Sequence, residues 1–160
     1  MSNDDRTARA LVTGASSGIG EAFAKALAAR GCDLVLVARR RDRLDDLAKQ
    51  LERAYGIDCT TVSLDLSEPD PGARLRALVD GDVDLLINSA GFATQGPFIE
   101  GDAHDFARVL AVDVAAVVDL CRTFLPEMVR RRRGAIMNLS LIHISEPTRR
   151  LRGSRMPSSA

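Results

Sequence analysis

Short apolar segments alternate with helical patterns along most of the chain, and this alternation limits the possible folds more than any other feature. Segment 33–38, DLVLVA, is continuously apolar, which is typical of a strand covered on both faces. In segment 42–55, leucine and alanine recur at helical spacing and Gly56 follows, which indicates an amphipathic helix. Such alternation predicts a parallel sheet with helices on both faces and right-handed crossovers.

The pattern predicts one α/β domain, a Rossmann-like doubly wound parallel sheet that stops after about the fifth strand. Strands are expected at 10–13, 33–38, 59–66, 83–88 and 134–139, and helices at 21–30, 42–55, 71–79 and within 103–133. An incomplete nucleotide-binding domain is therefore expected over residues 1–138. Its ligand should lie beyond the carboxyl ends of the strands, near the point where the strand order reverses.

Composition and charge argue against several other classes of protein. Lys and Arg total 22 and Asp and Glu total 22, so no overall attraction to nucleic acid or to an anionic membrane is expected. The polar N-terminus is unlike a signal peptide, and no apolar run approaches the roughly 18 residues of a membrane span. Three scattered cysteines are typical of a reducing compartment, so we expect a cytoplasmic protein without a metal site.

The stretch TGASSGIG, residues 13–20, directly follows the first expected strand. Glycines let the backbone turn tightly and approach a pyrophosphate, while the following helix directs free N–H groups and its positive dipole end at the same anion. The strand–turn–helix context that such a motif requires is present, so the stretch predicts phosphate binding. Its candidate cofactor-binding residues are Gly14, Ser16, Ser17, Gly18, Ile19 and Gly20.

The spacing Thr-Gly-x3-Gly-x-Gly resembles that of the short-chain dehydrogenase/reductase family, and further motifs follow in that family's order from about Ala8 to Ser140. Asp65-Leu66 resembles the acidic position that the family places against the adenine, and NSAG, residues 88–91, resembles its Asn-Asn-Ala-Gly. The resemblance implies hydride transfer between a nicotinamide cofactor and a small-molecule carbonyl or alcohol, in a parent protein that is a homo-oligomer. It adds Asp65, Leu66, Asn88, Ala90 and Gly91 to the candidate cofactor-binding residues.

The end of the second strand predicts which nicotinamide cofactor is bound. An acid there would hold a ribose 2′-hydroxyl, whereas this chain has Ala38 followed by Arg39. A guanidinium suits a phosphate dianion, so NADP (NADPH) is expected in preference to NAD. Arg39 is the main candidate for the 2′-phosphate, and Arg40 and Arg43 are secondary.

The residues that the family uses for proton transfer are missing from the sequence. The family places a tyrosine four residues before a lysine, but the only tyrosine here is Tyr55, and no lysine follows it at that spacing. Asp113 stands at the position of the family's helix asparagine, and it keeps an acceptor while it loses the amide donor. No complete catalytic set is present, so the chain as given is expected to be inactive.

Residues 139–160 do not continue the family pattern. LSLIHISEPTRR and the later SRMPSSA resemble a translation of sequencing-adapter DNA, which predicts a non-native or disordered tail. A tail that docks on the sheet is the alternative, because Ile142 and Ile144 alternate with polar neighbours. Without the family's further helices, an apolar face should also be partly uncovered at Val112, Ala116, Val117, Leu120 and Phe124.

Two other functions remain open at this point. A non-catalytic NADP(H)-binding module would need none of the missing groups. A methyltransferase also uses a glycine-rich turn after its first strand, but it would place an acid where Ala38 and Arg39 stand. The combination of motifs therefore favours the oxidoreductase.

Overall fold

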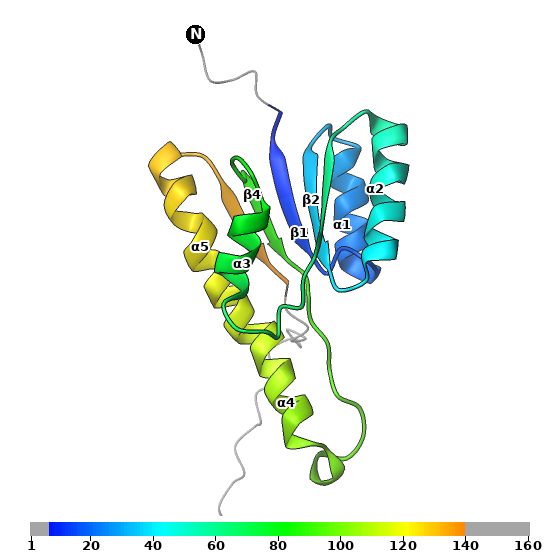
Figure 1. The fold of residues 1–160 in the computed structure, drawn as a ribbon, viewed down its shortest axis with the longest axis vertical. Helices are drawn as coiled ribbons and strands as arrows, with labels where there is room; N and C mark the ends of the chain where they lie inside the picture. Colours follow the sequence, from blue (N-terminus) through cyan, green and yellow to red (C-terminus); the bar gives the residue numbers. More distant parts are fainter. Residues whose placement is uncertain (1–6, 140–160) are drawn as a thin grey trace, which may run out of the picture.

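A computed structural model describes residues 7–139, so the tail predicted from residue 139 onward lies outside the described residues except for Leu139. Five parallel strands form one sheet in the order β3-β2-β1-β4-β5 (Figure 1). The strands are β1 (Arg9–Thr13), β2 (Asp33–Ala38), β3 (Cys59–Ser63), β4 (Leu85–Asn88) and β5 (Ala135–Asn138). The predicted Rossmann-like sheet is confirmed, with the order reversing between β1 and β4.

Helices cover both faces of this sheet (Figure 1). Helices α1 (Gly18–Ala28) and α2 (Arg41–Tyr55) cover one face, and α3 (Pro71–Leu78) and α5 (Ala116–Arg131) cover the other. Helix α4 (Ala103–Leu110) runs into α5 through a π-helical turn at Ala111–Ala115, and a short 3-10 turn at Phe98–Glu100 precedes it. The long helical region predicted over 103–133 is thus two helices joined without a break.

Alternate strand residues enter two separate cores because successive side chains of a strand point to opposite faces. In β1, Leu11 packs into the core beneath α3 and α5, while Ala10 and Val12 pack beneath α1 and α2. All three side chains are buried. This double burial explains why the strand segments are continuously apolar rather than alternating.

Two predicted boundaries differ from the structure by three residues each, and each has a local cause. The third strand ends at Ser63 rather than at residue 66, because the Asp65 carboxylate accepts a hydrogen bond from the Ser67 amide and turns the chain away. The first helix begins at Gly18 rather than at residue 21. Its first turn contains two of the motif glycines, whose low helix propensity conceals the start in the sequence.

The predicted uncovered apolar face is wrong for four of its five residues. Val112, Ala116, Leu120 and Phe124 are buried in the core against the sheet. The apolar residues that remain exposed lie on the other side of the same helical region, at Leu110, Val114, Val118, Leu125 and Val129. Sequence spacing identified an apolar helix but did not separate the face against the sheet from the outer face.

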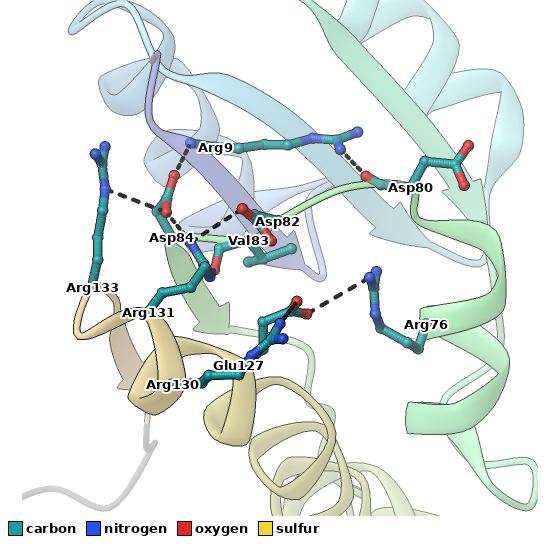
Figure 2. A network of polar contacts seen from close by, with 10 residues as sticks. All are labelled: Arg9, Arg76, Asp80, Asp82, Val83, Asp84, Glu127, Arg130, Arg131 and Arg133. Carbon is teal, nitrogen blue, oxygen red and sulfur yellow. Dashed lines mark hydrogen bonds and ion pairs between the residues drawn. The ribbon is translucent and has the colours of Figure 1, made fainter. Parts of the chain in front are cut away.

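An ion-pair cluster closes the end of the sheet at which β1 and β4 begin (Figure 2). The buried Asp84 carboxylate accepts a hydrogen bond from Arg131 Nη1 at 2.9 Å and from the Arg9 backbone N–H at 3.1 Å. Arg131 Nη2 also donates to the Val83 carbonyl at 2.9 Å. The cluster therefore ties the last turn of α5 to two neighbouring strands.

Three of the four arginines at residues 130–133 form ion pairs within the domain. Arg133 Nε lies 3.4 Å from Asp84 Oδ1, and Arg130 forms an ion pair with Glu127 at 2.8 Å (Figure 2). Arg132 ends α5 with a left-handed backbone, at φ +53°. Three of these arginines thus serve contacts within the domain.

Among residues 7–139, none of the helices combines the length and the apolar character that crossing a bilayer requires.

Candidate functional site

A cleft of about 790 Å³ lies where the strands end at their carboxyl termini. It contains most of the residues that the sequence predicted. The predicted residues that line it are Gly14, Ser16, Ser17, Ile19, Gly20, Arg39, Arg40, Asp65, Leu66, Ala90, Gly91 and Asp113. Gly18, Arg43 and Asn88 were also predicted and are not among its lining residues.

The three glycines of the first turn are required for different structural reasons. Gly14 has a φ of +68°, and a Cβ there would lie 2.9 Å from the Ala90 Cα. A Cβ on Gly20 would collide with the Gly14 carbonyl. Gly18, with a φ of +59°, has open space around its missing Cβ. Gly14 and Gly20 are thus required for protein packing, whereas Gly18 needs the left-handed backbone that begins α1.

Thr13 joins the first turn to the turn after β4, a role that sequence reasoning did not assign. Its buried hydroxyl accepts hydrogen bonds from the amides of Ser89 and Ala90, both at 3.1 Å. The same hydroxyl donates to the Ile87 carbonyl at 3.4 Å. The two loops that face the cleft are therefore held together by one side chain.

The serines of the motif contact an arginine of the next loop. Arg40 Nη2 donates to the Ser17 hydroxyl at 3.0 Å and to the Ser16 hydroxyl at 3.1 Å. Ser17 is also the N-cap of α1, although no side-chain cap bond is formed. A cation therefore lies beside the positive end of a helix, an arrangement that a bound anion would stabilise. Ile19 lies in the first turn of α1, where it is 53% exposed.

Arg39 and Arg43 differ in their positions relative to the cleft. Arg39 follows β2 directly and lines the cleft, with its carbonyl accepting a hydrogen bond from the Ser63 hydroxyl at 3.1 Å. Arg43 is exposed on the first turn of α2 and is not a lining residue. Of the three predicted arginines, Arg39 and Arg40 are the two that the fold brings to the cleft.

Asp65 lies just beyond β3, in the half of the cleft that contains the arginines. Its Oδ1 accepts hydrogen bonds from the Ser67 hydroxyl at 2.7 Å and from the Ser67 amide at 2.9 Å. Burial alone raises the pKa of the Asp65 carboxyl, but these hydrogen bonds and the charges of Arg39 and Arg108 outweigh it and lower the pKa. Leu66, the next residue, is buried beneath the cleft.

The NSAG turn after β4 begins with a buried residue, and the residues that follow form part of the cleft wall. The buried Asn88 side chain donates to Asn138 Oδ1 at 2.8 Å, which joins β4 to β5 below the cleft. Ala90 packs against Gly14, and Gly91 faces Asp113. Asn88 therefore shapes the site from below, while Ala90 and Gly91 form its surface.

Asp113 lies in the π-helical turn between α4 and α5. Its Oδ1 accepts a hydrogen bond from the Phe92 amide at 3.2 Å, and a Cβ on Gly91 would lie 3.2 Å from the same oxygen. A π-helical turn is often found at a functional site because the extra residue redirects a side chain. Here the π-helical turn places the Asp113 carboxylate beside the loop that follows β4.

Several wall residues were not predicted from the sequence. They are mostly apolar and surround the half of the cleft over β4 and β5: Ser89, Phe92, Ala93, Val109, Val112, Val114, Val117, Asn138 and Leu139. Their positions depend on how α4 and the π-helical turn lie over the sheet, for which the sequence has no local signal.

The other groups considered for catalysis lie elsewhere. Tyr55 is 46% exposed at the end of α2, and Lys25 forms an ion pair with Glu21 at 2.6 Å on α1. The three cysteines are free. Within residues 7–139 there is no group of three or more His, Cys, Asp or Glu side chains placed to hold a metal ion.

The groups around the start of α1 fit the phosphate chain of a dinucleotide. The Gly18 backbone has open space beside it, two serine hydroxyls and the Arg40 guanidinium lie at the start of α1, Arg39 lines the same cleft, and the cleft continues on both sides of β1. Backbone N–H groups, hydroxyls and arginine are the donors that phosphates bind in proteins.

Several proteins of known family are similar to this chain. The chain is 34% identical over 136 residues to very-long-chain 3-oxoacyl-CoA reductase-A of Danio rerio, a match that covers 82% of the chain and 43% of that protein. A short-chain dehydrogenase from Sphingobium yanoikuyae in complex with NADPH is 38% identical, with a TM-score of 0.77, over 82% of this chain and 52% of the other.

A third similar protein is L-sorbose reductase from Gluconobacter frateurii, complexed with NADPH and L-sorbose. It is 33% identical, with a TM-score of 0.75, and the match covers 82% of this chain and 51% of that one. The chain thus spans about half the length of these relatives. The family model for short chain dehydrogenases matches residues 8–148. With its sheet order, glycine turn and NSAG turn in the family's arrangement, the chain belongs to the short chain dehydrogenase family.

Proposed function

We propose that the chain binds NADP(H) as the nucleotide-binding part of an oxidoreductase that acts on a small-molecule carbonyl or alcohol. The observation that carries this proposal is the pair Arg39 and Arg40, which line the cleft beside the glycine turn with no acidic residue ending β2. Two relatives solved with NADPH, 38% and 33% identical, support the same cofactor.

Each group of cleft residues has a separate task in this proposal. The start of α1 and the Ser16 and Ser17 hydroxyls bind the pyrophosphate, while Arg39 and Arg40 bind the 2′-phosphate. The nicotinamide, when bound, supplies or accepts the hydride. Apolar wall residues such as Val112 and Val117 exclude water from the half of the cleft over β4 and β5.

Nucleotide titration of the purified chain tests the proposal. NADPH should bind at least tenfold more tightly than NADH, since the two differ only in the 2′-phosphate. Replacing both Arg39 and Arg40 with alanine should remove the difference, whereas Arg43→Ala, outside the cleft, should leave it unchanged. Equal affinity of the unaltered chain for both nucleotides, or no binding, would contradict the proposal.

A non-catalytic NADP(H)-binding module is the second candidate. It is favoured by one observation, namely that no tyrosine or lysine is among the cleft residues within 7–139. In both candidates the chain as given should bind NADPH without oxidising it when a panel of ketones and aldehydes is added. Turnover by the purified chain would contradict the expected lack of catalytic groups. A parent protein that reduces a carbonyl would favour the oxidoreductase over the module.

We also infer that the parent protein is a homo-oligomer. The support is the row of exposed apolar residues on the outer side of α4 and α5, at Leu110, Val118, Leu125 and Val129. Light scattering of the parent protein, with Val118→Asp as the disrupting variant, tests this. A monomeric parent would overturn it.

A further inference from the structure

The two halves of the cleft carry opposite charge. Arg39, Arg40 and Asp65 lie in the half over β2 and β3. Over β4 and β5, Asp113 is the one charged side chain among the described lining residues. Arg108, a cation of the same helical region, contacts other groups, since it stacks over the Phe92 ring at 5.6 Å and lies 3.9 Å from Asp105.

The proposed binding mode determines which end of the cofactor meets this carboxylate. The glycine turn at the end of β1 lies at the centre of the cleft, so it takes the pyrophosphate. The arginines lie on one side of that turn, and they take the adenosine with its 2′-phosphate. The nicotinamide half must therefore lie on the other side, over β4 and β5, where Asp113 lines the wall.

The charge of the nicotinamide changes with its redox state. Its ring carries one positive charge in NADP⁺ and none in NADPH. A carboxylate in the wall of a partly apolar cleft attracts the charged ring and has no net Coulomb interaction with the neutral one. Asp113 is held in this wall, because its Oδ1 accepts the Phe92 amide hydrogen bond at 3.2 Å.

We infer that Asp113 makes the site selective for the oxidised cofactor, by stabilising the pyridinium ring of NADP⁺ relative to NADPH. This inference rests on the proposed function and adds the preferred redox state to it. For unit charges about 4 Å apart that are screened as in bulk water, the attraction corresponds to an affinity difference of about fivefold.

The test is a set of equilibrium titrations with NADP⁺, NADPH and adenosine 2′,5′-bisphosphate, which lacks the nicotinamide. Asp113→Asn keeps an acceptor for the Phe92 amide and removes only the charge. It should weaken NADP⁺ about fivefold and leave the other two ligands unchanged. Asp46→Asn, an exposed change on α2 with the same loss of charge, should change none of the three.

A second variant separates charge from loop position. Asp113→Ala removes the acceptor as well, so a purely structural role would weaken NADP⁺ and NADPH equally in Asp113→Ala and leave both affinities unchanged in Asp113→Asn. That result overturns the inference, as does an unchanged NADP⁺ affinity in Asp113→Asn. Binding of adenosine 2′,5′-bisphosphate without either dinucleotide also overturns it, while the proposed phosphate site stands. Failure of the unaltered chain to bind any of the three overturns the proposed function itself.

Discussion

The two ends of the β-sheet use arginine in opposite ways. At the amino-terminal end, Arg131 is 17% exposed and its guanidinium is held by Asp84 and by the Val83 carbonyl (Figure 2). At the carboxyl-terminal end, Arg39 and Arg40 are exposed beside the positive end of α1. A buried, paired arginine is part of the fold, whereas exposed arginines at a positive helix end indicate a site for an anion. Position, rather than residue type, separates the two roles.

The largest effect is expected at the buried ion pair. Arg131→Ala leaves the Asp84 carboxylate, which is 7% exposed, without its strongest donor. Loss of one partner of a buried pair costs about 3–5 kcal/mol in the free energy of unfolding, and the exposed edge of this pair places the loss near about 3 kcal/mol. Urea unfolding measures it. A loss below about 1 kcal/mol would show that Arg133 and Arg9 replace the lost donor.

The glycine turn should couple stability to binding, unlike the ion-pair cluster. Gly14→Ala adds left-handed strain and a contact with Ala90, so we expect a loss of about 2–3 kcal/mol and at least tenfold weaker NADPH binding. Gly56→Ala has a similar φ, +66°, with open space around the Cβ. It should cost about 1 kcal/mol and leave NADPH affinity unchanged. Equal effects of the two variants on NADPH affinity would show that Gly14 has no specific role in the binding site.

A pH-dependent effect is expected at Asp65, on the cleft side. The folded chain lowers the pKa of this carboxyl, so the unfolded chain takes up the proton first as the pH falls. Its stabilising contribution is therefore complete above the unfolded pKa of about 4 and is lost as the pH falls through the folded pKa. Ser67→Ala removes a hydroxyl donor and should reduce the dependence of unfolding free energy on pH in this window. An unchanged slope in urea unfolding series would contradict it.

The smallest effect is expected one residue from the largest. Arg130 pairs with Glu127 at 2.8 Å, but 74% of its side chain is exposed. Exposed pairs contribute about 0–1 kcal/mol, so Arg130→Ala should change the free energy of unfolding by less than about 0.5 kcal/mol. A larger loss, measured beside Arg131→Ala, would mean that the cluster acts as one network.

Sequence patterns predicted the sheet because the central strands β1, β2 and β4 are apolar on both faces and helices α1, α2 and α5 each have one buried apolar side. They also located the glycine turn and Arg39, since these follow the strands immediately. Helix faces were harder to predict. Val112 and Val114 are both apolar, yet the first is buried and the second exposed, because residues two apart lie on opposite sides of a helix and the sequence does not show which side faces the sheet.

The missed part of the site depends on contacts between distant segments. Nothing near Thr13 in the sequence shows that its hydroxyl meets the amides of Ser89 and Ala90. Likewise, Asn88 has the same motif position whether it faces a ligand or Asn138. Such roles follow from which strands become neighbours, and β1 pairs with β4 only through the tertiary fold.

The hydroxyl of Thr13 also has a consequence for the order of folding. It bonds amides that lie 76 and 77 residues further along the chain, so the two loops of the cleft meet only after β4 has paired with β1. Contacts between residues so far apart in sequence form late, because they close a long loop of chain. A nucleotide cannot bind a chain in which only β1, β2 and their helices have formed. It would slow unfolding of the complete domain without accelerating the first steps of its formation.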